Sequence, residues 1–171
     1  MSPAKSAPTP SFRVRPATEA DSPVLLALLR EFAAHEESAH LMLATEPTLR
    51  EALGAKPPML RAALVEGAEG AVGFATYTVD FMTWANSRVL RLDDLYVRES
   101  VRGGGLGRAL MRHLAEVGTA EGLPVRWEMR PENAPARAFY ERIGASSREK
   151  TVFRWMPDAM RRFLAEMPPT S

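Results

Sequence analysis

The sequence has no cysteine, no marked excess of either charge and no long apolar run, and each absence excludes a class of function. Without cysteine the chain can form no disulfide, offer no thiolate to a metal and use no thiol nucleophile. Its 22 lysines and arginines nearly balance its 21 aspartates and glutamates, so the charge gives no reason to expect nucleic acid or an anionic membrane as a partner. No apolar run reaches membrane-spanning length and no secretory leader pattern stands at the start, so we expect a cytoplasmic protein.

Length and composition are those of one globular domain. The chain has 171 residues, of which 46% are hydrophobic and 25% charged, and this is enough to bury a sizeable core. We predict a single domain over residues 12–167. Residues 1–11, in which Ser, Pro, Ala and Thr dominate, are expected to be a flexible tail, and residues 168–171 a second, shorter one.

Hydrophobic periodicity and turn residues predict an α/β protein with helices on both sides of a mixed sheet. The predicted strands are Phe12–Arg15, Leu60–Glu66, Ala71–Phe81, Arg88–Val97, Pro124–Met129 and Thr151–Met156. The predicted helices are Val24–Glu36, Glu46–Leu53, Leu106–Glu121, Ala134–Ile143 and one at the C-terminus.

The glycine-rich turn between the fourth of these strands and the third helix has the layout of an anion site. Gly103, Gly104, Gly105 and Gly107 can adopt positive φ, and the next helix begins with unpaired N–H groups and the positive end of its dipole. No Gly-Lys-Ser/Thr follows, so this is not a P-loop, and the spacing does not fit a dinucleotide fingerprint. What remains is R-x-x-G-x-G, beginning at Arg102. By itself this pattern is equally typical of a tight strand-to-helix connection.

Three segments in order resemble the GNAT family of N-acetyltransferases. They are the strand LDDLYV, the R-x-x-G-x-G turn with its helix, and N-x-x-A-x-x-F-Y-x-x-x-G from Asn133 to Gly144. The likeness extends over most of residues 12–164 and is greatest to the diamine and spermidine/spermine branch, some members of which acetylate thialysine. It implies a mostly antiparallel central sheet of six to seven strands with a V-shaped splay. It also implies acetyl-CoA as cosubstrate, an amine acceptor and a homodimer. Acyl transfer from a thioester to an amine needs no metal, so none is expected.

The resemblance assigns coenzyme-binding residues to this chain. Main-chain atoms of Leu95, Tyr96 and Val97 would face the thioester and the pantetheine arm. Asn133 would lie near that arm while also capping the following helix. Arg102 or Arg108 could add a charge-assisted contact to the pyrophosphate, although an arginine on an early helical turn can equally be solvated. The pyrophosphate would lie on Arg102, Gly103, Gly104, Gly105, Leu106, Gly107 and Arg108.

Tyr140 matches the family tyrosine whose phenol points toward the coenzyme sulfur. A phenol with a pKa near 10 can donate a proton to a departing thiolate, which makes Tyr140 the predicted general acid. The alternative is an aromatic pair with Phe139 that packs in the core.

Asp93 and Asp94 are adjacent carboxylates in an otherwise apolar strand, where they are costly unless something compensates them. By resemblance Asp93 would be the general base, acting directly or through water, and Asp94 would bind the positive charge of the acceptor. In a regular strand the two point to opposite faces, but a bulge nearby would change that. The alternative is a structural ion pair with Arg91, Arg126 or Arg154.

Weaker predictions concern the acceptor pocket and its substrate. Glu36 and Glu37, which end the first long helix, and Trp84, which precedes the fourth strand, could shape it; a solvated helix end and hydrophobic cover are the simpler interpretations. The polyamine branch has a tryptophan near the place of Lys150, and a cation at this place would repel a polyamine. A shorter amine or an amino-acid-like acceptor with its own carboxylate therefore also fits. A protein or peptide acetyltransferase and a non-catalytic acyl-CoA sensor are the alternatives.

Overall fold

The computed structural model describes residues 12–166, and its contacts divide the chain into two compact units, Met1–Glu128 and Met129–Ser171. The tails predicted over residues 1–11 and 168–171 lie outside the described residues. Within residues 12–166, the first unit contains the sheet and three α-helices, and the second contains two α-helices.

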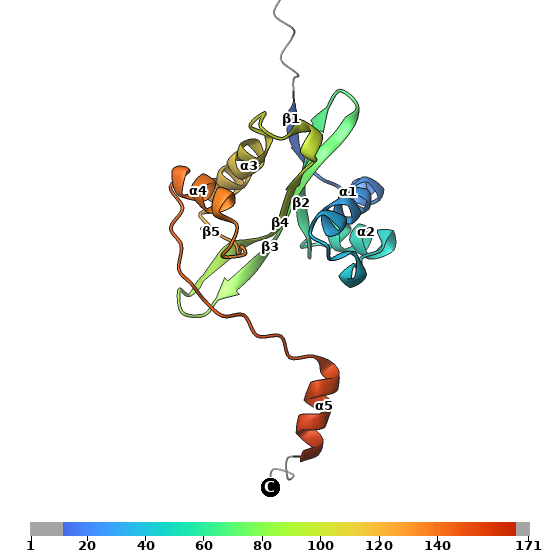
Figure 1. The fold of residues 1–171 in the computed structure, drawn as a ribbon, viewed down its shortest axis with the longest axis vertical. Coiled ribbons are helices and arrows are strands. Elements are labelled where there is room, and N and C mark those ends of the chain that lie inside the picture. The colour runs from blue at the N-terminus through green and yellow to red at the C-terminus, as the bar shows by residue number, and fades with distance from the viewer. Residues whose placement is uncertain (1–11, 167–171) are drawn as a thin grey trace, which may run out of the picture. The chain divides into compact units, whose positions relative to one another are not determined.

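The sheet of the first unit has five strands in the order β1-β2-β3-β4-β5 (Figure 1). The first four pair antiparallel with their sequence neighbours, whereas β5 runs parallel to β4. The strands are β1 (Arg13–Pro16), β2 (Arg61–Gly67), β3 (Gly70–Met82), β4 (Ser87–Val97) and β5 (Val125–Arg126). The sheet is thus mixed and mostly antiparallel, as predicted.

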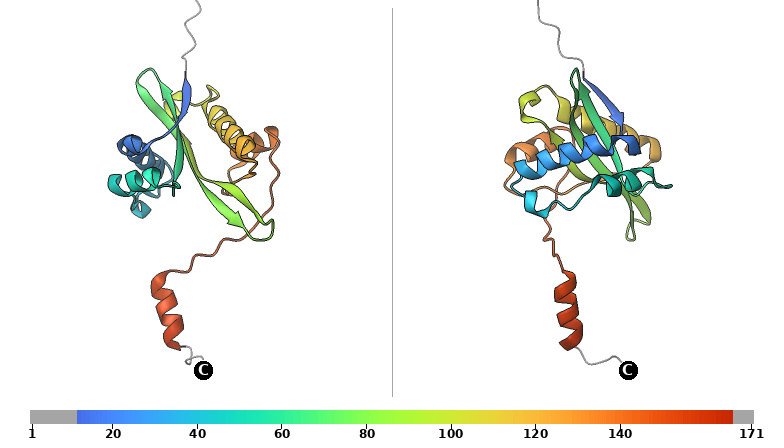
Figure 2. Two further views of the ribbon diagram at one scale, coloured as in Figure 1. Left: turned by 180° about the vertical axis from the view of Figure 1, so that it is seen from behind. Right: turned by 90° about the vertical axis from the view of Figure 1, so that its right-hand side faces the viewer.

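Helices cover both faces of this sheet. Figures 1 and 2 show α1 (Ser22–His35) and α2 (Glu46–Gly54) on one face and α3 (Leu106–Glu121) on the other. Short 3₁₀ turns lie at Glu19–Asp21 (η1), Ala39–Leu41 (η2) and Glu99–Val101 (η3). No helix within residues 12–166 combines the length and apolarity that a membrane crossing requires.

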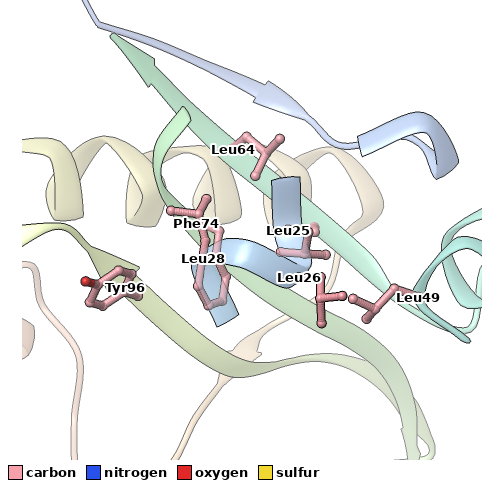
Figure 3. Packing of buried hydrophobic residues seen from close by; sticks show 8 residues of the cluster. Leu25, Leu26, Leu28, Leu49, Leu64, Phe74 and Tyr96 are labelled. Carbon is pink, nitrogen blue, oxygen red and sulfur yellow. The ribbon is translucent and has the colours of Figure 1, made fainter. Parts of the chain in front are cut away.

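The core follows from this double cover. Ala62, Ala63, Leu64 and Val65 of β2 are all buried, because successive side chains of a strand point to opposite faces and both faces are covered. On the α1 side, Leu64 and Phe74 of the sheet pack with leucines of α1 and α2 (Figure 3). The members of that cluster are Leu25, Leu26, Leu28, Leu49, Ala62, Leu64, Phe74 and Tyr96.

The second unit contains α4 (Ala134–Arg142) and α5 (Pro157–Glu166). The side chain of Asn133 accepts a hydrogen bond of 3.2 Å from the main-chain N–H of Ala136, which confirms its predicted capping role. Gly144, with φ of 90°, follows the end of α4.

Two strand predictions differ from the structure. The segment Thr151–Met156 has no strand pairing within the described chain, and Val152 and Phe153 are exposed, so five strands are present there instead of six to seven. The fifth strand is also shorter than the predicted Pro124–Met129. Both differences have one cause. Side-chain propensity favours an extended backbone, but a strand also needs hydrogen bonds to a neighbour.

Candidate functional site

Strands β4 and β5 are paired over only two residues. Leu90 and Arg91 of β4 lie opposite Val125 and Arg126, while β4 continues to Val97. Over residues 92–97 that edge of β4 has no strand partner among residues 12–128. The predicted coenzyme-binding main chain of Leu95, Tyr96 and Val97 belongs to this unpaired part.

A β-bulge at Asp93 changes which way the following side chains point. Thr76 of β3 is opposite Asp94, but Tyr77 is opposite Leu92, so Asp93 is an extra residue. Its effect is visible in the packing. Leu90 lies near Gly118 of α3 and Leu95 near Gly107 of α3, although residues separated by an odd number face opposite ways in a regular strand.

The bulge places Asp94 on the side of the sheet that α1 covers, together with Tyr96. There it interacts electrostatically with Glu36, the residue that follows α1. Burial and the negative charges of Asp93 and Glu36 raise the pKa of the Asp94 carboxyl, and a hydrogen bond of 3.4 Å from Thr76 Oγ1 opposes them in part. Asp94 forms no ion pair with a basic residue of the described chain.

The end of α1 is shaped so that Glu36 is held in place. The N–H of Glu36 donates to the carbonyl of Phe32 at 2.9 Å, and Glu37 takes a positive φ of 53°, which ends the helix. The hydroxyl of Ser38 then donates to the carbonyl of Glu36 at 2.8 Å. Of the two predicted glutamates, Glu36 is the one whose charge contributes to the raised pKa of Asp94.

Asp93 has a different environment. Its carboxylate lies 2.7 Å from Nη1 of Arg91, whose Nε donates to Asp80 at 2.7 Å. Burial raises the pKa of Asp93 and the charge of Asp80 adds to the effect, although Arg91 opposes it. The ion pair with Arg91 is the structural alternative that the sequence left open for this residue.

The glycine turn has the predicted anion-site geometry in part. Gly103 and Gly105 take positive φ of 85° and 78°, and α3 begins directly afterwards. Gly104 and Gly107 do not take positive φ, and Gly107 already belongs to the first turn of α3. The N–H groups of Leu106, Gly107 and Arg108 have no intrahelical acceptor at this helix start.

The guanidinium of Arg102 is engaged within the protein. Its Nε donates to the carbonyl of Val97 at 2.9 Å, an Nη donates to Nε2 of His35 at 3.2 Å, and its central carbon lies 5.8 Å from the centre of the Tyr96 ring. Arg108 is exposed. Sequence reasoning assigned no role to His35 here, because residues so far apart along the chain give no local signal of contact.

Two further predicted residues have clear local surroundings. The Tyr140 ring lies 5.3 Å from that of Phe139 within α4, and burial raises the pKa of its phenol. Trp84 lies in the turn between β3 and β4 with a fully exposed side chain. The predicted roles of Tyr140 in catalysis and of Trp84 in the acceptor pocket remain predictions.

Comparison with known proteins identifies the same architecture. The model of the acetyltransferase (GNAT) family matches residues 25–145. Thialysine N-epsilon-acetyltransferase of Bos taurus is 29% identical over 161 residues, which are 86% of this chain and 94% of that protein. Human spermidine/spermine N(1)-acetyltransferase-like protein 1 is 30% identical over 114 residues, 62% of this chain and 16% of that protein. A solved integron cassette protein from the mobile metagenome of V. cholerae superposes with a TM-score of 0.72 at 26% identity, covering 92% of this chain and 99% of that one.

Proposed function

The chain belongs to the acetyltransferase (GNAT) family, and from this premise we propose that it transfers the acetyl group of acetyl-CoA directly to a primary amine of a small cationic molecule. The observation that carries the proposal is the position of Asp94. The pKa of this carboxylate is raised, with the charge of Glu36 among the causes, and Asp94 lies on the part of β4 that has no partner on the β5 side among residues 12–128. The order of the motifs and the fold indicate the reaction class. The negative charge of this carboxylate indicates that the acceptor is a cation.

The coenzyme side of the proposal rests on main-chain groups. An extended arm can hydrogen-bond to the unpaired edge of β4 at Leu95, Tyr96 and Val97, as another strand would. The diphosphate would be held by N–H groups of the turn and of the first turn of α3, where Gly103 and Gly105 give the chain its positive φ. Main-chain N–H groups can bind an anion whatever side chains surround them, so they explain coenzyme binding without a cluster of basic residues.

On the acceptor side we assign the general base to Asp94 and revise the expectation for Asp93. An alkylamine with a pKa near 10.4 must lose a proton before it attacks, and a carboxylate of raised pKa is the better proton acceptor. Asp94 meets this requirement with no arginine partner among the described residues, whereas Asp93 is held by Arg91. Asp93 and Glu36 then provide negative charge that favours binding of the ammonium group.

The reaction balances with these groups. Asp94 takes one proton of the ammonium, the free nitrogen attacks the thioester carbonyl carbon, and the bond between that carbon and sulfur breaks. By the family motif, Tyr140 gives its phenolic proton to the departing thiolate. The nitrogen loses its second proton as the neutral amide forms, and that proton restores the phenol of Tyr140 after the phenol has protonated the sulfur. The raised pKa of Tyr140 keeps the phenol protonated at neutral pH and so available as an acid.

A thiol-release assay with acetyl-CoA and a panel of amines tests the proposal. The panel contains diamines, polyamines, amino acids with a side-chain amine, and peptides with free N-termini. We expect release with small cationic amines. Release with peptides alone would make the protein a peptide acetyltransferase, and coenzyme binding with no release for any amine would make it a sensor.

The variant Tyr140→Phe tests the acid separately. Loss of the phenolic proton should lower kcat by about a hundredfold, while the Kd for CoA stays within twofold, because the ring is retained. Isothermal titration and steady-state kinetics measure the two quantities. An unchanged kcat would remove Tyr140 from the acid role.

A further inference from the structure

One face of α1 holds the two arginines that stand on either side of the η3 turn. Glu31 and His35 are four residues apart, so they lie on the same side of the helix, one turn from each other. Glu31 contacts Arg98, which precedes η3, and His35 contacts Arg102, which follows it. The glycine turn begins at the next residue, Gly103.

Arg98 is fixed from three directions. Its Nε donates to Oε2 of Glu31 at 2.7 Å and an Nη donates to Oε1 at 2.6 Å, a bidentate pair. Its other Nη donates to the carbonyl of Ala71 at 3.2 Å, and its main-chain N–H donates to the carbonyl of Val72 at 2.9 Å. Helix α1, strand β3 and the end of β4 therefore meet at this one residue.

Arg102 is fixed in a similar way at the other end of the turn. Because a guanidinium only donates, Nε2 of His35 is the acceptor in their contact of 3.2 Å. The His35 and Tyr96 rings lie 6.2 Å apart, and Arg102 lies over Tyr96. The contact with Val97 ties the same guanidinium to the last residue of β4.

Between the two arginines the main chain closes on itself. The N–H of Val101 donates to the carbonyl of Arg98, and the N–H of Arg102 donates to the carbonyl of Glu99, each at 3.1 Å. With both ends held by α1, the turn has one path into Gly103 and Gly105. This main-chain conformation sets the orientation of the N–H groups that would face a diphosphate.

We propose that Glu31 and His35 are positioning residues for the coenzyme, which act through Arg98 and Arg102 and orient the glycine turn before the diphosphate arrives. The inference rests on the proposed function, since it takes the coenzyme diphosphate as the ligand of the turn. It gives Arg102 a structural duty in place of a direct phosphate contact. A turn that is already ordered loses less conformational freedom on binding, so the benefit belongs to coenzyme affinity.

Three variants of the full-length protein test this assignment. Glu31→Gln removes the charge of the bidentate pair. His35→Phe keeps a ring against Tyr96 but removes the acceptor for Arg102. Glu121→Gln is the matched control, because it breaks another ion pair between a helix and the sheet, with Arg61, at the far end of α3. The measurements are the Kd for CoA, the KM for acetyl-CoA, kcat and Tm.

We expect Glu31→Gln to raise the Kd for CoA and the KM for acetyl-CoA about tenfold, and His35→Phe about fivefold, with kcat changed less than twofold. Glu121→Gln should lower Tm to a similar extent and leave the Kd unchanged. A double-mutant cycle adds Arg98→Gln and the double variant Glu31→Gln, Arg98→Gln. The loss of affinity in the double variant should not exceed the larger of the losses in Glu31→Gln and Arg98→Gln, because the two residues act as one unit.

The opposite results are distinct. An unchanged Kd in Glu31→Gln and His35→Phe, with Tm lowered as in the control, would overturn the positioning role. Tighter binding of CoA in His35→Phe would show that the released Arg102 contacts the diphosphate, which also overturns it. If the unmodified protein binds no CoA, the proposed function fails, and this inference with it, before any variant is compared.

Discussion

Two groups of carboxylates in the first unit have opposite electrostatic surroundings. Around Arg15, the carboxylate of Asp21 accepts two guanidinium hydrogen bonds of 2.7 and 2.9 Å and Glu66 accepts one of 2.9 Å. Arg15 holds the pKa of Asp21 well below its ordinary value. On β4, burial and neighbouring negative charges raise the pKa of Asp94 instead.

The difference separates carboxylates whose charge stabilises the folded protein from one whose charge destabilises it. Asp21 binds its proton less tightly when folded, so it adds stability above its unfolded pKa and loses this as the pH falls. Asp94 binds its proton more tightly when folded, so its charge costs stability at neutral pH, and the cost disappears in acid. A carboxylate kept at such a cost is a candidate for chemistry.

The largest expected effect concerns activity and the β4 group. Asp94→Asn should lower kcat/KM by about a hundredfold or more, because the amide cannot accept the ammonium proton. Asp93→Asn is the matched change one residue away and should lower it less than tenfold, since Asp93 is already paired with Arg91. Steady-state kinetics on the best amine measures both, and equal losses would erase the distinction between the two aspartates.

The next effect concerns stability and the Arg15 group. Asp21→Asn should lower the free energy of unfolding by about 2 kcal/mol, because it weakens charged hydrogen bonds to Arg15 and the cap at Thr18. Glu46→Gln, in the exposed pair with Arg50, is the control and should change it by less than about 0.5 kcal/mol. Urea unfolding decides whether the two differ.

A smaller effect has the opposite sign. At pH 7 Asp94→Asn should raise the free energy of unfolding by up to about 1 kcal/mol, because it removes a buried and repelled charge. The gain in the free energy of unfolding should vanish when the pH is lowered below the folded pKa of Asp94. The loss in Asp21→Asn should also become smaller as the pH is lowered. Urea unfolding at several pH values gives both trends; a gain that persists in acid would contradict the raised pKa.

The smallest effect concerns the hydrogen bond from Thr76 to Asp94. Thr76→Val keeps the shape of the side chain and removes the donor at 3.4 Å, which otherwise favours the carboxylate. The acid limb of the pH profile of kcat/KM should then move to higher pH by a few tenths of a unit. A shift to lower pH would mean that another group controls that limb.

Prediction from the sequence succeeded where the signal was local. Helix α3 begins and ends as predicted, at Leu106 and Glu121, because Gly105 and Gly122 provide the left-handed conformations at its two ends. The capping role of Asn133 follows equally from neighbouring residues. The segment Thr151–Met156 shows the limit of local prediction. Its composition favours a strand, but a strand also requires hydrogen bonds to a neighbouring strand, which local sequence does not reveal.

The sequence by itself determined the order of the elements, the glycine turn and the adjacent pair of aspartates, because periodicity, caps and motifs act over a few residues. Only the tertiary structure decided the different surroundings of the two aspartates. The extra residue of the bulge can be recognised only against β3, and it turns Asp94 toward Glu36 while Asp93 stays with Arg91. The contacts of Glu31 with Arg98 and of His35 with Arg102 are of the same kind. They join residues far apart in the chain, and only the packing of α1 on the sheet brings such residues within hydrogen-bonding distance.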